Sequence, residues 1–421
     1  MADAADARSP RWPAPETLLW LPIAGVALGQ RFVLPGASIA DLCLGTFSAI
    51  GLALLARTER RLPRLPAWAG WLAALWVWAA VGGVAHVLLR TEAFSALEFS
   101  KSLAKLSFYA VAVVVLSLAL RRATRVETTR MVLTAFAAAG VVAIAIYVAM
   151  LLQVPLPYQA LWGRGPETAY FHELRWFGDP GAAGRVFLRA QGLASEPSRL
   201  GYLQAMALAF LLLGPGARVK PGLRLVLIML SALLTFSLTG YALLAPVLGL
   251  VLLDRWRAGD LAPGRRGLAL AAAVLLLLLP LAPTLYQAVV VRGSRSLSGS
   301  GDVSARLRVL GNWEMTYRLL ETSPVLGVGL GNFDVMAREL QAFLFQGHLV
   351  DENTQGWNVF AYVLATTGVP GLLLLLALLV AAFRGRGRLA LLFVLGMFAD
   401  STVLGAAYWL FFALYTAEER A

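Results

Sequence analysis

The chain has 421 residues, of which 59% are hydrophobic and 14% are charged, and its mean hydropathy is +0.71. A soluble domain is usually nearer half apolar and a quarter charged, so the composition excludes an ordinary soluble protein and indicates an integral membrane protein. The formal net charge of +12 raises the question of nucleic-acid binding, which the positions of the arginines answer. The single cysteine, Cys43, excludes an internal disulfide and a cysteine metal site.

Apolar runs long enough to cross a ~30 Å hydrocarbon core recur along the whole chain. They predict an all-α integral membrane protein of about 12 transmembrane helices. A polar segment, MADAADARSPRWPAPE, precedes them, and we interpret it as a retained cytoplasmic tail. The predicted spans are 17–32, 37–56, 67–89, 102–120, 131–152, 199–213, 223–238, 240–253, 267–290, 357–383, 389–402 and 405–417.

The spans divide the chain into five parts. Residues 1–152 hold the first five spans, 153–198 form a long loop, 199–290 hold four more spans, 291–356 form a second long loop, and 357–421 hold the last three.

Basic residues in the short loops predict the orientation. The segments ARTERRLPRLP, RRATRVETTR, GPGARVKPGLR, DRWRAGDLAPGRR and FRGRGR are rich in arginine and all fall on one side of the membrane. The positive-inside rule therefore puts both termini in the cytoplasm and both long loops outside. Most of the positive charge then reflects topology, and we expect no nucleic-acid partner.

The two long loops differ in composition. The first is rich in Trp, Tyr, Phe, Pro and Gly, which favours a folded flap at the membrane interface. The second opens with RGSRSLSGSG and continues as DVSARLRVLGNWEMTYRLLE, where an amphipathic helix is predicted to begin near Asp302 and to end at Ser323-Pro324. Its residues on one helical face are Leu310, Trp313, Tyr317 and Leu320.

Arginines gather on the outer side, where the orientation rule does not favour them. Arg185, Arg189 and Arg199 surround the start of the sixth span, and Arg292, Arg295, Arg306 and Arg308 follow the ninth. They are either interfacial anchors that reach lipid headgroups or a binding site for a phosphate-bearing lipid. Guanidinium groups bind phosphate oxygens two at a time, which favours the lipid site for the set as a whole.

Candidate acids and bases are few. Glu196 and Arg199 form an i,i+3 pair at a helix start, so Glu196 is either a cap with a local ion pair or a catalytic acid. Of the histidines, His86 is expected to be packed at the outer end of the third span, and His172 lies in the aromatic flap. His348, ahead of the tenth span, is the best-placed general base, although a loop histidine is more often a surface residue.

The glycines of GVGLGNF do not form a dinucleotide fingerprint, because no strand–helix unit surrounds them. A tight turn after Pro324 is the simpler interpretation. The sequence contains no Asp-x-Asp, no His-Glu-x-x-His and no P-loop, so we expect neither a metal nor another cofactor. Arginine alone would then stabilise a departing phosphate.

Together these residues resemble the family of O-antigen polymerases (Wzy-type) and O-antigen ligases, membrane proteins of polysaccharide assembly. The resemblance covers residues 185–375 and includes the decapeptide PVLGVGLGNF. The other matching motifs are an Arg-x-x-Gly followed by a proline (Arg189, Gly192, Pro197), Arg306 seven residues before Trp313, and a Gly-x-x-Gly in the tenth span (Gly368, Gly371).

The resemblance implies a GT-C-like glycosyltransferase in the bacterial inner membrane. Its donor would be an undecaprenyl-diphosphate-linked oligosaccharide, its active site periplasmic and its reaction independent of metal. The family arginines that hold the diphosphate correspond to Arg189 and Arg306. Ligases resemble one another in a His-Asn pair where this chain has Trp357-Asn358. If that histidine is the base in ligases, this chain either uses the nearby His348 or does something different.

The sequence therefore predicts an inverting Wzy-type polymerase that joins one lipid-linked repeat to another. SEPS, before the sixth span, resembles polymerases more than ligases. Arg189 and Arg306, helped by Arg292, Arg295 or Arg308, would stabilise the leaving diphosphate, and His348 or Glu196 would accept the hydroxyl proton.

Three alternatives remain open. They are a ligase with lipid A–core as acceptor, a transporter or flippase, and a binding protein for chain-length control. The expected partners of the polymerase are the lipid-linked donor and acceptor, membrane lipids and a chain-length regulator. Asp400 is the acid that would suit a transporter, although it could equally sit at a helix end.

Overall fold

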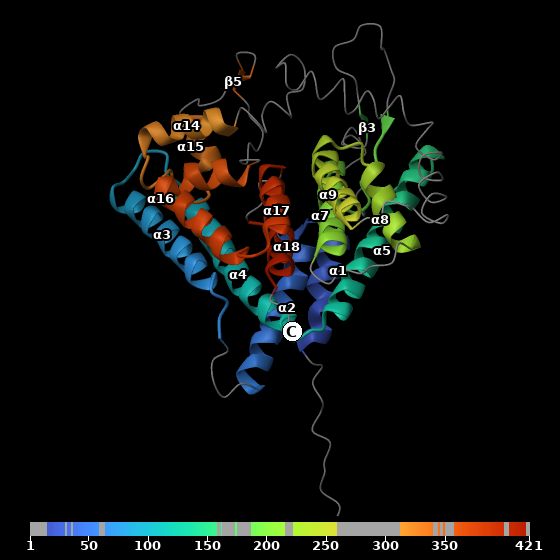
Figure 1. Ribbon diagram of the computed structural model, residues 1–421. Coiled ribbons are helices and arrows are strands. Elements are labelled where there is room, and N and C mark those ends of the chain that lie inside the picture. Colours follow the sequence, from blue (N-terminus) through green and yellow to red (C-terminus); the bar gives the residue numbers. More distant parts are fainter. Residues whose placement is uncertain are drawn as a thin grey trace, which may run out of the picture.

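The computed structural model describes residues 15–29, 32–34, 37–58, 64–157, 161, 173–174, 187–214, 222–258, 312–339, 344–345, 348–349, 358–399 and 404–417. Within them the chain is a bundle of helices with three two-stranded hairpins (Figure 1). Each predicted span that falls wholly or partly inside these ranges overlaps a helix, whereas the span predicted over 267–290 lies outside them.

The first part of the chain contributes five helices to the bundle. They are α1 (Trp20–Leu28), preceded by a 3₁₀-helix η1 (Pro15–Leu19), then α2 (Ile39–Thr58), α3 (Ala69–Leu88), α4 (Ala96–Leu120) and α5 (Arg125–Leu151). A hairpin of β1 (Phe32–Leu34) and β2 (Ala37–Ser38) joins α1 to α2. Polar caps set the starts of α4 and α5: Ser95 accepts from the Glu98 amide, and Thr124 and Glu127 form a capping box.

The other described helices come after residue 157. They are α7 (Pro197–Leu213), α8 (Leu223–Leu233), α9 (Leu238–Arg257), α14 (Asn312–Thr322), α15 (Phe333–Glu339), α16 (Val359–Ala382), α17 (Gly387–Ala399) and α18 (Ala406–Thr416). Two of them, α14 and α15, lie within the second long loop. Two more hairpins pair β3 (Glu173–Leu174) with β4 (Phe187–Leu188) and β5 (Leu344–Phe345) with β6 (His348–Leu349).

Among the described residues, five helices are long and apolar enough to cross a membrane. These candidate spans are Ile39–Arg57, Ala69–Leu88, Ala96–Leu120, Arg125–Leu151 and Val359–Ala382. Five further apolar helices in the described ranges are shorter, with 10–17 residues. The all-α membrane architecture agrees with the sequence, while the full number of twelve spans is not established by these helices.

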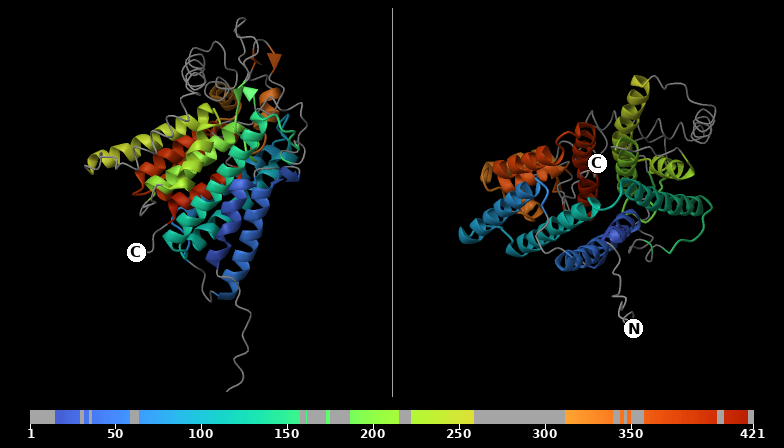
Figure 2. Two further views of the ribbon diagram at one scale, coloured as in Figure 1. Left: turned by 90° about the vertical axis from the view of Figure 1, so that its right-hand side faces the viewer. Right: turned by 60° about the horizontal axis from the view of Figure 1, so that its bottom comes forward.

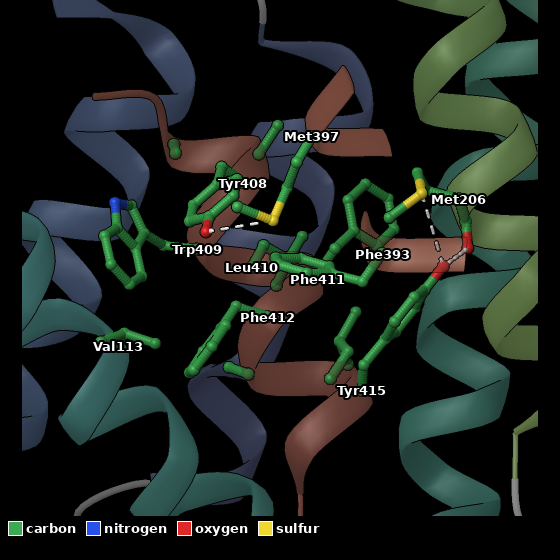
Figure 3. Packing of buried hydrophobic residues seen from close by; sticks show 14 of the residues in the cluster. Val113, Met206, Phe393, Met397, Tyr408, Trp409, Leu410, Phe411, Phe412 and Tyr415 are labelled. Atoms are coloured by element: carbon green, nitrogen blue, oxygen red, sulfur yellow. Dashed lines mark hydrogen bonds between the residues drawn. The ribbon is translucent and has the colours of Figure 1, made fainter. Parts of the chain in front are cut away.

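Helix α18 forms the centre of the bundle. All its residues are buried, as expected for a helix that is apolar on every side. Figure 3 shows its aromatic side chains among residues of α4, α7 and α17, with the labelled residues Val113, Met206, Phe393, Met397, Tyr408, Trp409, Leu410, Phe411, Phe412 and Tyr415. The Tyr415 hydroxyl donates a hydrogen bond of 2.7 Å to the Met206 carbonyl and so ties α18 to α7.

Described parts of both long loops lie at one end of the bundle. Strands β3 and β5 and helices α14 and α15 gather there, above the helix ends, in two views that differ by a quarter turn (Figures 1 and 2). We call this the loop end. This placement agrees with the prediction that both long loops share one side of the membrane.

Helix α16 is interrupted at Gly368, where φ is +68° and ψ is −172°. In a regular helix the amide of Val369 would donate to the Ala365 carbonyl, but here it donates to the Pro324 carbonyl at 3.0 Å. Pro370 has no amide hydrogen for the Thr366 carbonyl. The predicted tenth span is therefore two helical segments.

Residues 323–332, which we call the glycine loop, satisfy the carbonyls freed by this break. The amide of Val328 donates to the Ala365 carbonyl at 2.8 Å, and the amide of Gly329 donates to the Thr366 carbonyl at 3.0 Å. A Cβ on Gly327, where φ is +68°, would lie 2.5 Å from backbone atoms of α16. Backbone therefore packs on backbone here, which explains why glycines occupy this turn.

Side chains of α3 complete the attachment of the glycine loop. The indole nitrogen of Trp78 donates to the Thr367 carbonyl at 2.8 Å, and Nε2 of His86 lies 2.7 Å from the Gly327 carbonyl. Because a carbonyl can only accept, Nε2 of His86 carries the hydrogen. The expectation of a packed His86 is confirmed, and GVGLGNF has a structural role that goes beyond a tight turn.

Candidate functional site

Arg189 follows strand β4 directly at the loop end. Pairing of Leu188 with Glu173 fixes the strand, and the next two residues then attach to the link between α8 and α9. The Arg189 Nε donates to the Thr235 carbonyl at 3.0 Å, and the Ala190 amide donates to the Leu234 carbonyl at 2.8 Å. Arg189 is partly buried and interacts electrostatically with Tyr241. The Arg189 guanidinium is thus anchored to the backbone of the link between α8 and α9.

The starts of α7 and α9 meet beside Arg189. A Cβ on Gly201 would lie 3.0 Å from the Thr235 Oγ1 and 3.2 Å from the Gly240 Cα, so the two helices touch through their backbones. The Ser237 side chain caps α9 by accepting from the Gly240 amide at 3.3 Å. Each helix start carries the positive end of a helix dipole, which adds to the Arg189 charge. This arrangement suits an anion.

The residues after Arg189 keep this segment in place. Gly192 has φ +59°, and a Cβ there would lie 3.0 Å from the Ala143 Cβ of α5, so the Arg-x-x-Gly spacing has a packing reason. Gln191 is 2% exposed, and its amide nitrogen donates to the carbonyls of Ala194 at 2.8 Å and Ser195 at 2.9 Å. The segment is a rigid support and not a free loop.

Glu196 occupies the N-cap position of α7, with Pro197 as the first helical residue. Its side chain makes no capping hydrogen bond, so the interpretation of Glu196 as a side-chain cap is wrong. Instead, Glu196 Oε2 accepts a 2.9 Å hydrogen bond from the Ser198 hydroxyl. Glu196 also interacts electrostatically with Arg199, as the predicted local pair requires.

A second charged group near Arg199 was not predicted. Asp41, near the start of α2, and Tyr109 of α4 both interact electrostatically with Arg199, whose guanidinium lies 5.6 Å from the centre of the Tyr202 ring. The Tyr109 hydroxyl donates to Asp41 Oδ1 at 2.6 Å. An acid within an apolar run was the signal that could have identified Asp41.

Several predicted site residues lie outside the described residues. They are Arg185, Arg292, Arg295, Arg306 and Arg308, together with His172, Trp357 and Asp400. His348 lies in β6, where it pairs with Phe345 of β5. The structure therefore places Glu196 and Arg199 as a pair at the start of α7 and Arg189 at the link between α8 and α9. The second set of arginines stays a prediction.

Helix α14 confirms part of the helix expected in the second loop, and it ends at Thr322, just before Ser323-Pro324. Its buried face is not the predicted one. Trp313 and Tyr317 are exposed, whereas the buried residues are Asn312, Met315, Thr316 and Leu319. The Thr316 hydroxyl donates to the Ala361 carbonyl at 3.1 Å, so this buried face packs against α16.

Asp334 is a further acid at the loop end that the sequence did not identify. It lies in the first turn of α15, directly after the glycine loop, and its Oδ1 is shielded from solvent and accepts no hydrogen bond from the described residues. Burial raises the pKa of Asp334 from the ordinary 3.8 to about 6, against the opposing effect of Arg338. Across the described ranges, no three His, Cys, Asp or Glu side chains come together as a metal site.

The comparisons with known proteins give one family match, which covers the middle of the chain. The O-antigen ligase family, Wzy_C, matches residues 223–376, which include α8, α9, α14, α15 and most of α16. A comparison with curated proteins gives no match for the chain. The apolar helices and this match together indicate a multi-pass membrane protein. The matched part of the chain, residues 223–376, is therefore similar to the O-antigen ligase family.

Proposed function

We propose that the protein is an O-antigen or related polysaccharide polymerase of the GT-C type. The hydroxyl of a sugar on one lipid-linked repeat attacks the anomeric carbon of a second glycan, which is linked to undecaprenyl diphosphate. The new C–O bond forms as the bond to the diphosphate breaks, so the anomeric centre inverts. The loop end faces the periplasm, both termini are cytoplasmic, and the membrane is the bacterial inner membrane.

The observation that carries this proposal is the position of Arg189. Its guanidinium is anchored to the Thr235 carbonyl where the starts of α7 and α9 meet, in a chain that matches the O-antigen ligase family. Arg189 and Arg306, with Arg292, Arg295 or Arg308, stabilise the negative charge that grows on the departing diphosphate. One such preorganised donor typically contributes about 10²–10³ in rate.

Holding two lipid-anchored reactants in one membrane site supplies a further part of the rate, because orientation replaces a bimolecular encounter. From the sequence, His348 or Glu196 accepts the proton that leaves the attacking hydroxyl. The reaction as proposed uses neither a metal nor another cofactor. A chain-length regulator is the protein partner that this activity implies.

A ligase is the second candidate, because the matching family is described as O-antigen ligase. It would use the same donor and transfer the glycan to lipid A–core. A deletion strain separates the two functions by its lipopolysaccharide bands. Loss of a polymerase leaves core with a single repeat, whereas loss of a ligase leaves bare core. Bare core in the deletion strain would refute the polymerase.

Complementation tests the arginine site in the same strain. We expect Arg189→Ala to abolish long polymer and Arg189→Lys to restore little of it, because an ammonium cannot replace the two-point contact of a guanidinium with phosphate. Arg224→Ala is the matched control, since Arg224 is exposed at the start of α8. Full polymer with Arg189→Ala would show that the site lies elsewhere.

A further inference from the structure

Asp334 is held more firmly than its position in a long loop suggests. Asn332, two residues earlier, is fully buried, accepts from the Ser95 amide at 2.7 Å and donates to the Ser95 carbonyl at 3.3 Å. The next residue, Phe333, packs its ring 5.9 Å from the ring of Tyr362 on α16. The Gly331 amide donates to the Tyr362 hydroxyl at 3.3 Å. Contacts to α4 and α16 therefore fix the backbone that carries the carboxylate.

The surroundings of the Asp334 carboxylate destabilise its ionised form relative to the protonated form. Its Oδ1 is out of contact with solvent and accepts no hydrogen bond from any described residue, although the side chain as a whole is partly exposed. Burial of this kind raises its pKa to about 6. Arg338, one turn further along α15, and Tyr362 of α16 are the groups that interact with it electrostatically. On α14, which also packs against α15, the charged side chains of Glu314, Arg318 and Glu321 are exposed.

A purely structural explanation leaves this arrangement unaccounted for. A buried carboxylate oxygen without a hydrogen-bond donor costs free energy, and an asparagine or a serine would fill the same position at lower cost. Such an acid, on a rigid element and with one side open, is instead suited to proton transfer. A base is most effective when its pKa lies close to the working pH and its position is fixed.

We propose that the Asp334 carboxylate accepts the proton of the attacking sugar hydroxyl. The hydroxyl oxygen forms the new bond to the anomeric carbon, and its proton moves to the carboxylate. The electron pair of the broken bond stays on the undecaprenyl diphosphate, so no other reactant is needed. This inference rests on the proposed function and replaces His348 and Glu196 as the acceptor.

The test is the rate of polymer formation by the purified protein in liposomes that contain an undecaprenyl-diphosphate-linked repeat, measured from pH 5 to pH 9. The variants are Asp334→Asn and Asp334→Glu, with Glu339→Gln as the matched control because Glu339 is an exposed acid on the same helix. His348→Gln and Glu196→Gln represent the competing bases. Binding of undecaprenyl diphosphate is measured for each variant.

We expect the wild type to lose activity as the pH falls through about 6. We call this fall in rate at low pH the acid limb of the pH–rate profile. Asp334→Asn should lower the rate by about 10²-fold or more, remove this acid limb and leave binding of undecaprenyl diphosphate unchanged. Asp334→Glu should recover part of the rate and move the limb, which a structural role would not do. If Asp334→Asn does not fold, the position of the limb in Asp334→Glu decides the question.

Two other results separate the possible failures. A wild-type rate of zero would overturn the proposed function, and the inference with it. A polymerising wild type whose rate and acid limb are unaffected in Asp334→Asn would overturn only the inference. Loss of the limb in His348→Gln or Glu196→Gln, and not in the Asp334 variants, would return the role to that residue.

Discussion

Replacing Gly327 with alanine tests the attachment of the glycine loop to α16. The residue has φ +68°, which costs an alanine roughly 1–2 kcal/mol relative to glycine. Its new Cβ would also lie 2.5 Å from the Thr366 carbonyl carbon and the Thr367 amide nitrogen, and 2.6 Å from the Ala365 carbonyl oxygen. These are backbone atoms that cannot rotate away, so the clash adds about 1–3 kcal/mol. The variant should lose about 2–5 kcal/mol of stability in total.

Gly385→Ala is the matched control for this variant. Gly385 has φ +77°, and a Cβ there would have no heavy atom within 4 Å, so this change measures the backbone strain alone. The assay is unfolding of the detergent-solubilised protein, followed by tryptophan fluorescence. The difference between the two variants then gives the free energy of the clash. Equal losses of stability in Gly327→Ala and Gly385→Ala would refute the close docking of the glycine loop.

Two further changes concern the same end of the molecule. Trp78→Phe removes the indole donor to the Thr367 carbonyl and should cost about 1–3 kcal/mol in the same unfolding assay, whereas Trp71→Phe, on an exposed position of α3, should cost little; similar losses would contradict this hydrogen bond. Asp334 holds its proton more tightly in the folded state, so wild-type stability should fall by up to about 3 kcal/mol as the pH rises from 3.8 to about 6. Asp334→Asn lacks this loss and should unfold at a higher temperature than the wild type at pH 7.5; a lower one would show that the carboxylate has a stabilising partner.

The helices could be predicted because hydropathy and span length depend on local sequence. The span predicted over 199–213 agrees with α7 to within its first turn, where Pro197 fixes the start. The interruption of α16 was also visible in principle, since Gly368 and Pro370 stand close together in an apolar run. Its repair by the glycine loop was not, because that depends on a backbone contact between segments about forty residues apart.

In the candidate site, too, features that depend on local sequence could be predicted, and features that depend on contacts between distant segments could not. The sequence singled out Arg189 because the predicted orientation puts it on the side of the membrane where arginine is disfavoured. The role of the following Gly192 appears only in the structure, where it packs on α5. Asp334 and Asp41 could not be ranked above other acids, since their importance comes from burial and from partners on distant helices. The face of α14 was misjudged for a related reason: Thr316 bonds to α16, while Trp313 stays exposed.

The most direct test of the proposed polymerase is transfer by the purified protein with defined lipids. Wild-type protein in liposomes receives an undecaprenyl-diphosphate-linked repeat alone or together with lipid A–core, and the products are separated by size. The account predicts a ladder of polymer with the repeat alone in the wild type, and none with Arg189→Ala at equal amounts of folded protein. A product that forms only when lipid A–core is present, or a full ladder with Arg189→Ala, would contradict it.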